Sequence, residues 1–420
     1  MNDTLSAFPF TVVFLSLLGI SFLVQSYLAY RQRRHVAAHA GRVPSLFAAH
    51  IPPEQHEKAA QYAIAKSRFG QIQLLFHTLM LLWLTLGGGF EWLQQLWMVL
   101  LPSGIAQQTV VLLSVFAVLQ LVELPFLYYS HFHLEARFGF NRLSRRLFVL
   151  DILRGALLGA VLGGGLIAAL LALMVSAGEQ WWLWAWGLWV GFSVLLMVIF
   201  PLWIAPLFNR FTPLADVVLK DRVERLLQRC GFDSQGIFVM DSSKRSAHGN
   251  AYFTGFGRAK RIVFFDTLLD HLSHDEIEAV LAHELGHFHH QHIRQRLWGS
   301  IIFSLLLFAV LGVLADTSAF YQQLGVNTVS AAAALFLFSQ LLPLLLFPLT
   351  PLFSALSRRQ EYQADEFAAQ HAPAAALISA LTKLYRDNAA TLTPDPLHSA
   401  FYDSHPPATA RVAKLQGFLS

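Results

Sequence analysis

Seven long apolar segments constrain this chain more than any other feature of its sequence. They lie near residues 10–30, 72–86, 110–129, 155–175, 182–204, 297–314 and 331–352. Most reach the roughly 17–25 residues that an α-helix needs to cross a bilayer, and the second and sixth are the doubtful ones. Charged residues make up only 13% of the chain, against about a quarter in soluble domains. The sequence therefore predicts a mainly α-helical protein with seven membrane spans.

The distribution of positive charge supports this count. All 30 Lys and Arg residues lie in alternate loops between the apolar segments. The basic stretches are 31–68, 137–154, 210–296 and 358–420, whereas the N-terminus and the loops at 88–107, 176–181 and 315–330 contain neither residue type. Because cytoplasmic loops carry the excess of Lys and Arg, the N-terminus is expected outside and the C-terminus in the cytoplasm. The net charge of +4 then reflects contact with anionic membrane lipid, and no nucleic-acid partner is expected.

The segment at 209–296 differs from its surroundings, because charged and turn residues replace the apolar runs. A helix is expected at 217–230, and short strands at 237–240 and 262–266. A further short extended run, expected within residues 247–255, could align a peptide along a strand edge or form an ordinary hairpin. We expect four parts: spans 1–5 with their loops at 1–208, a small cytoplasmic α+β domain at 209–296, spans 6 and 7 at 297–356, and a C-terminal cytoplasmic segment at 357–420.

Within the cytoplasmic domain, His283-Glu284-Leu285-Gly286-His287 has the spacing of a zinc-binding helix. Histidines four residues apart lie on one helix face and can bind the same ion. Glu284 lies beside them and can take a proton from a water that the metal activates. The stretch predicts a metal-dependent hydrolase.

The context of this stretch favours a helix. Ser273 and Glu276 have the pattern of a capping box, so a helix is expected to begin near His274. The alternative is a run of ordinary surface histidines that continues to His292. His289, His290 and His292 are individually assigned to that ordinary class, because a metal site needs ligands that converge from separate elements.

A catalytic zinc site needs a third protein ligand, which must come from elsewhere. After the last apolar segment, Glu361 and Asp365 are four residues apart and share one face of an expected helix. One carboxylate can bind the metal while the other orients a ligating imidazole. The alternative is a solvated acidic pair, or one paired with a neighbour such as Arg358.

Several stretches resemble the integral-membrane CAAX prenyl proteases, zinc metallopeptidases that cleave near the C-terminus of prenylated proteins. Besides the seven-span plan, the resemblance rests on residues 245–255, 260–268, 283–287, 361–365 and 404–407. It covers nearly the whole chain. It implies a zincin-like metallopeptidase domain, and spans that form a barrel around a water-filled chamber. Polar residues inside the spans, such as His77, Gln120 and Glu123, would suit a wet interior or could form hydrogen bonds between helices.

The resemblance also implies a role for each site residue. Zinc, one ion per chain, would be bound by His283, His287 and Glu361, with Asp365 as a partner behind the ligands. Glu284 would act as the general base. His405 would hydrogen-bond the developing oxyanion. Asn250 would hold the substrate backbone, and Arg411 would lie near the substrate.

The predicted function is a membrane-embedded zinc endopeptidase that processes the C-terminus of prenylated or similar peptide and protein substrates. Two alternatives stay open: a general quality-control metalloprotease of the HtpX type, and a zinc-stabilised membrane scaffold without catalysis. Residues 417–420 contain no KDEL-type or dilysine retrieval signal, so a bacterial inner membrane is favoured over the endoplasmic reticulum.

Overall fold

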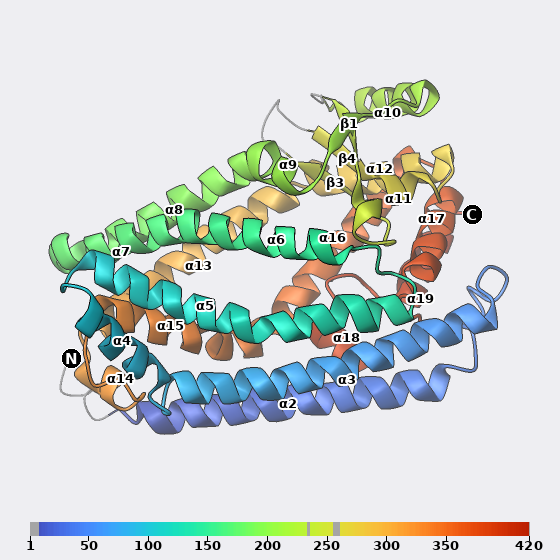
Figure 1. Ribbon diagram of the computed structural model, residues 1–420. Helices are drawn as coiled ribbons and strands as arrows, with labels where there is room; N and C mark the ends of the chain where they lie inside the picture. Colours follow the sequence, from blue (N-terminus) through green and yellow to red (C-terminus); the bar gives the residue numbers. More distant parts are fainter. Residues whose placement is uncertain (1–7, 233–235, 255–260, 420) are drawn as a thin grey trace.

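The chain folds into long helices with one small sheet at one end of them, as a computed structural model shows (Figure 1). The structure describes residues 8–232, 236–254 and 261–419. Two residues of the stretches that carry the family resemblance lie outside the described residues: Gly255, the last residue of 245–255, and Lys260, the first residue of 260–268. The predicted fold class, a mainly α-helical membrane protein with a small α+β domain, is confirmed.

The longest helices cover all seven predicted apolar segments and extend beyond several of them. They are α2 (Phe10–His39), α3 (Pro53–Leu84), α5 (Ile105–Tyr129), α6 (Arg145–Leu158), α7 (Gly164–Ser176), α8 (Trp181–Ile199), α13 (His292–Ala315), α15 (Ala331–Leu346) and α16 (Thr350–His371). Short turns continue some of these helices: η1 (Ser130–Glu135), η2 (Gly159–Gly163), η3 (Gly178–Gln180), η4 (Phe200–Ile204) and η6 (Phe347–Leu349). α15, η6 and α16 together run from residue 331 to 371, so the last span continues directly into the stretch that carries Glu361.

The number of spans is close to the prediction. Among the described residues, six helical segments are each long and apolar enough to cross a bilayer. A seventh span requires α3 together with α4 (Gly89–Leu100), and these two helices are bent by 51° relative to each other. The helix of the sixth predicted span is thus long and apolar enough to cross a bilayer by itself, whereas the helix of the second is not. α3 carries Gln71, Gln73 and His77 among its apolar residues, which lowers its hydropathy.

Polar side chains of two spans contact each other between α3 and α5. The His77 ring lies 2.8 Å from a carboxylate oxygen of Glu123, and Gln73 donates a hydrogen bond of 3.1 Å to the same carboxylate. Of the two expectations for these polar residues, a hydrogen bond between helices is therefore observed for His77 and Glu123.

In the part of the chain that the structure describes, the sheet has four strands in the order β1-β2-β4-β3. They are β1 (Phe211–Pro213), β2 (Ile237–Met240), β3 (Ala251–Thr254) and β4 (Arg261–Phe265). β2 and β4 are parallel, with Ile237 opposite Ile262, whereas β1 and β3 pair antiparallel with their neighbours. β2 and β4 lie where strands were predicted, and β3 forms an edge of the sheet.

Helices cover this sheet and build a second apolar core, separate from the core between the spans. The helices of this region are α9 (Ala205–Phe208), α10 (Val217–Arg229), α11 (Asp266–Leu269), α12 (His274–His289), α17 (Ala374–Asp387), α18 (Pro396–Tyr402) and α19 (Ala408–Gln416). Two further short elements among the described residues are η5 (Ser242–Lys244) and α14 (Ser318–Gln322). In Figure 1, α11, α12, α17 and α19 lie at the same end of the long helices as the sheet.

α12 and α16 pack closely against each other at Gly286. A Cβ atom at Gly286 would lie 2.8 Å from the Cα atom of Ala364, which is closer than side-chain carbons approach a backbone. The glycine between the two histidines of the zinc-like stretch thus lets α16 approach α12, and this contact places residues 361–365 beside residues 283–287.

We expect Gly286→Ala to destabilise the protein by about 1–3 kcal/mol, the usual cost of an added methyl group in a filled core. The variant should also hold less metal, because α16 must move away from α12. Gly299→Ala in α13 is the control, since a Cβ there meets nothing within 4 Å. Thermal unfolding in detergent and metal analysis measure both effects, and equal values for the two variants would contradict the close contact.

Candidate metal centre

α12 begins at His274, as its capping box predicts. The Ser273 hydroxyl accepts a hydrogen bond from the Glu276 amide, and the Glu276 carboxylate accepts one of 2.7 Å from the Ser273 amide. Glu276 also accepts hydrogen bonds from Ser379 and Lys383 of α17, at 2.6 and 2.7 Å. The Glu276 carboxylate therefore both caps the start of α12 and holds this helix against α17.

Three predicted ligands converge at the middle of the contact between α12 and α16. Their ligand atoms, from His283, His287 and Glu361, all lie within 4.8 Å of one another. His283 Nε2 lies 3.4 Å from Glu361 Oε2, and His287 Nε2 lies 3.3 Å from Glu361 Oε1. The interpretation of these residues as surface histidines and a solvated carboxylate is wrong, since His283 and Glu361 are buried.

The donor set fits a divalent cation. Glu361 Oε2 is buried and has no hydrogen-bond partner among the described residues. Such an atom is costly to bury alone, and a bound cation would satisfy it. Two imidazoles and one carboxylate are also the ligands of several catalytic zinc sites. By geometry and by chemistry, these three residues could hold a divalent metal ion.

Asp365 lies behind His283, as expected for a residue that orients a ligand. The Nδ1 atom of His283 is 2.8 Å from Asp365 Oδ1. A carboxylate only accepts, so when the ring is neutral its proton is on Nδ1 and Nε2 is free to bind a metal. The position of this proton is what a metal ligand requires.

Arg411 completes this buried arrangement. Its guanidinium donates to both oxygens of Asp365, at 2.7 and 2.6 Å, and its Nη2 atom lies 3.1 Å from His283 Nδ1. Burial lowers the pKa of this guanidinium, but the hydrogen bond and charge of Asp365 outweigh burial and raise the pKa above its usual value. Arg411 therefore stays charged.

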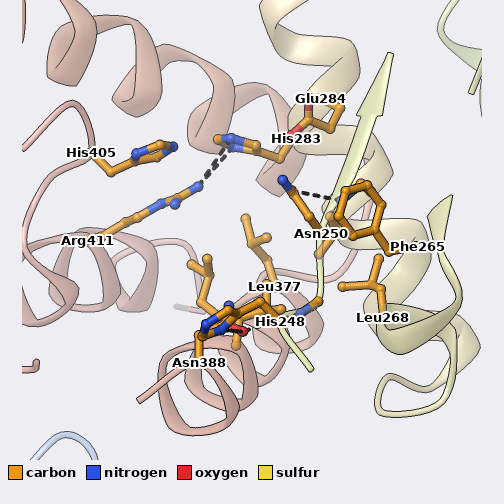
Figure 2. A pocket seen from close by; sticks show the side chains of 15 residues that line it. His248, Asn250, Phe265, Leu268, His283, Glu284, Leu377, Asn388, His405 and Arg411 are labelled. Carbon is orange, nitrogen blue, oxygen red and sulfur yellow. Dashed lines mark hydrogen bonds between the residues drawn. The ribbon is translucent and has the colours of Figure 1, made fainter. Parts of the chain in front are cut away.

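The metal site borders a cavity of about 410 Å³. Figure 2 shows Asn250, His283, His405 and Arg411 directed towards its interior from different elements. Glu284 lies at the wall beside His283, and burial raises the pKa of its carboxyl group. The ring of His405 is 60% exposed, and its Nε2 atom lies 3.5 Å from Glu361 Oε2. Asn250, directly before β3, accepts a hydrogen bond from the Ala251 amide with its side-chain oxygen.

Every predicted site residue lies in one region of the fold. Asn250, Glu284, His405 and Arg411 line the cavity, His283 and His287 join Glu361 at the metal site, and Asp365 lies behind His283. The arrangement combines a metal site, a carboxylic acid of raised pKa and a cavity bordered by an edge strand. This combination suits hydrolysis of a peptide bond.

Comparison with known proteins also indicates a peptidase. Residues 32–210 match the family described as CAAX prenyl protease N-terminal, five membrane helices, and residues 213–419 match Peptidase family M48. The chain is 32% identical to CAAX prenyl protease 1 homolog of Arabidopsis thaliana over 98% of both chains. It is 33% identical to CAAX prenyl protease 1 of Saccharomyces cerevisiae, over 94% of this chain and 92% of the relative. The crystal structure of S. mikatae Ste24p superposes with a TM-score of 0.90 at 32% identity, covering 97% of this chain and 99% of that one.

The chain belongs to the CAAX prenyl protease family. The resemblance seen in the sequence is thereby confirmed, and the protein is a multi-pass membrane metallopeptidase. The predicted division into four parts stays a prediction.

The structure of this CAAX protease family member also shows cavity residues that sequence analysis missed. α17 contributes Leu377, Leu381 and Leu384, and the loop after it contributes Asn388. The Asn388 side-chain oxygen lies 3.2 Å from His248 Nδ1 and accepts from the Gly249 amide. The apolar periodicity of α17 carries no sign of a cavity, because the same pattern describes any helix packed against a core.

His292 is a second omission, and here the sequence interpretation is wrong. It was assigned to the ordinary surface histidines, yet it is only 2% exposed and contacts the ligand His287. The residue just before it, Gln291, has a left-handed backbone conformation with φ of 56°. This turn directs His292 inward, and no sequence pattern predicts it.

The protonation of His283 predicts how metal affinity depends on pH. Burial and the Arg411 charge lower its pKa, but Asp365 and Glu361 together outweigh them and raise the pKa to about 9. A protonated imidazole cannot bind a metal, so binding must release this proton. Metal affinity should therefore rise about tenfold per pH unit up to about pH 9, instead of levelling off near the ordinary imidazole pKa of about 6.5.

Competition with a chromophoric chelator between pH 6 and 8.5, corrected for protonation of the chelator, measures this slope. An affinity that stops rising above pH 7 would contradict the raised pKa of His283.

Proposed function

We propose that this protein is a zinc-dependent endopeptidase that cleaves near the C-terminus of membrane-anchored, prenylated or similarly lipidated proteins. One observation supports it above the others: two imidazoles and a carboxylate converge beside Glu284 in a cavity bordered by the edge strand β3. The metal is proposed to be zinc, one ion per chain, because zinc favours this mixture of nitrogen and oxygen ligands in four-coordinate sites.

Zinc, when bound, supplies a Lewis acid that polarises the scissile carbonyl and makes water a better nucleophile near neutral pH. Glu284 takes the proton of the attacking water and later gives it to the leaving amine. Its raised pKa suits both steps, since a general base and acid works best with a pKa near the working pH. No residue of the chain forms a covalent bond to the substrate in this scheme.

The remaining site residues are proposed to hold the substrate and its transition state. Among the described residues, β3 pairs with β4 on one side only, so an extended peptide could bind along its other edge as an added strand. Asn250, at the start of this edge, would hold the peptide backbone. The exposed ring of His405 would donate a hydrogen bond to the oxyanion. Asp365 would hold His283, and Arg411 would hold Asp365 while it lines the substrate cavity.

The cavities favour a substrate that arrives from the membrane side. A second cavity of about 610 Å³ shares His248 and Asn388 with the metal-site cavity. Its other walls include Gln25 and Gln32 of α2 and Lys66 of α3. A lipid-anchored chain could therefore extend from the region of the spans to the metal centre.

Orientation follows from charge, because the Lys and Arg residues of alternate loops should face the cytoplasm. The N-terminus would then lie outside and the metal centre and C-terminus on the cytoplasmic side. The Arabidopsis and Saccharomyces relatives are eukaryotic, which favours the endoplasmic reticulum membrane over the bacterial inner membrane suggested by the sequence alone.

The general-base role predicts the behaviour of Glu284→Gln. The amide cannot accept a proton from water, so kcat should fall by about 10²–10⁴-fold, the usual contribution of such a group. Bound zinc should stay near one ion per chain, because Glu284 is not among the three converging ligands. Cleavage of a fluorogenic peptide and metal analysis of the same sample test both statements. Wild-type turnover in a zinc-loaded variant would contradict the role.

A pair of peptides tests the substrate. We expect a farnesylated peptide to be cleaved with a kcat/KM at least about tenfold above its unmodified twin, since burial of only two CH₂ groups at about 0.8 kcal/mol each provides that factor. A third peptide serves as the control. It carries a short polar group in place of the farnesyl group, at the same position and through the same thioether linkage. Equal cleavage of all three would favour the general quality-control protease, and no chelator-sensitive cleavage of any would favour the scaffold.

A further inference from the structure

His292 lies between a metal ligand and the helix that carries another ligand. It is the first residue of α13, and the left-handed turn at Gln291 places its side chain against the last turn of α12. Its Nδ1 atom lies 2.9 Å from His287 Nδ1, and its Nε2 atom lies 3.0 Å from Gln363 Oε1 of α16. Both nitrogens of this buried ring are therefore engaged.

With the Gln363 amide oriented as in the structure, these contacts order the protons. The Gln363 oxygen can only accept, so His292 Nε2 carries a proton. A neutral imidazole has one proton, which leaves His292 Nδ1 as an acceptor. The proton between the two rings must then belong to His287 Nδ1, and the lone pair of His287 Nε2 faces Glu361.

The opposite order of protons would abolish a ligand. If the Gln363 amide were turned to donate, His292 would carry its proton on Nδ1 and His287 would carry one on Nε2. The latter is the nitrogen that lies 3.3 Å from Glu361 Oε1 in the ligand set. Only the first order leaves both histidines able to bind, because Asp365 already sets the equivalent order in His283.

We propose that His292, itself oriented by Gln363, is a positioning residue that holds His287 in the tautomer and ring orientation that bind the metal. This inference rests on the metal site of the proposed function. The two ligating imidazoles are then held by chemically different partners, the carboxylate of Asp365 and the neutral ring of His292. A neutral partner fixes His287 without adding a further negative charge beside Glu361.

The test is the rate at which the purified, zinc-loaded full chain in detergent loses zinc to an excess of a chromophoric chelator. His292→Phe keeps an aromatic ring but removes the acceptor, and loss should be roughly 10–100-fold faster than in the wild type, as for other residues that orient metal ligands. His292→Asn offers an amide oxygen near the position of Nδ1, and its rate should lie closer to the wild type than to His292→Phe. His290→Phe is the matched control, since it makes the same exchange at a ring that stacks on His292 but takes no part in these two hydrogen bonds.

Two further readouts separate positioning from a general loss of structure. The metal-free forms of wild type and variants should unfold at similar temperatures, and the cobalt-loaded His292→Phe variant should show a changed visible spectrum, which reports the ligand geometry. Gln363→Met removes the oxygen that orients His292 and should also speed zinc loss, by a smaller factor. It decides the matter if His292→Phe does not fold.

The inference would be overturned if His292→Phe lost zinc at the wild-type rate. If His292→Phe does not fold, zinc loss at the wild-type rate from Gln363→Met would overturn it. An equal acceleration in His290→Phe would overturn it too, because the effect would then not depend on the hydrogen bonds. A wild-type chain that binds no zinc would instead refute the proposed metal site, so the two failures are distinguishable.

Discussion

The contact between α12 and α16 at Gly286 and Ala364 determines the rest of the site. Neither helix can bind a metal alone, because α12 supplies two imidazoles and α16 supplies the carboxylate. The absence of a side chain at Gly286 lets the two backbones approach closely, so that Glu361 reaches both His283 and His287. α16 is also the continuation of the last span. The helix that carries Glu361 is therefore continuous with the membrane part of the protein.

The site concentrates buried charge, which is costly unless the charges are paired. Arg411 lies between Asp365 and Glu361, at 2.6 and 3.8 Å from their carboxylate oxygens. One cation thus faces two carboxylates, and the remaining negative charge attracts a proton to His283 or, in its place, a metal ion. Asp365 and His292 lie next to different ligands, His283 and His287, as parts of two separate hydrogen-bonded arrangements. In the proposed scheme His287 would therefore be oriented independently of His283.

Much of this could be predicted from the sequence, where the physical signal is local. Apolar length and the alternation of Lys and Arg predict the spans, the Ser273–Glu276 box predicts the start of α12, and helical spacing predicts that His283 and His287 share a face. Glu361 and Asp365 have only weak local signals, and the family resemblance is what assigns Glu361 to the zinc and Asp365 to the position behind the ligands. The bend between α3 and α4, the burial of His292 and the α17 wall of the cavity depend on how distant segments pack. Such features leave no periodic pattern in the sequence. The burial of His292, for example, follows a single left-handed residue, Gln291.

The central claim is that one zinc ion binds where α12 and α16 meet. X-ray diffraction from crystals of the zinc-loaded protein, with data on both sides of the zinc absorption edge, measures the position of the ion directly. The account predicts one anomalous peak per chain, at about 2.0–2.2 Å from His283 Nε2, His287 Nε2 and a carboxylate oxygen of Glu361. A fully zinc-loaded crystal with the peak elsewhere, or with Glu361 outside the coordination shell, would contradict it.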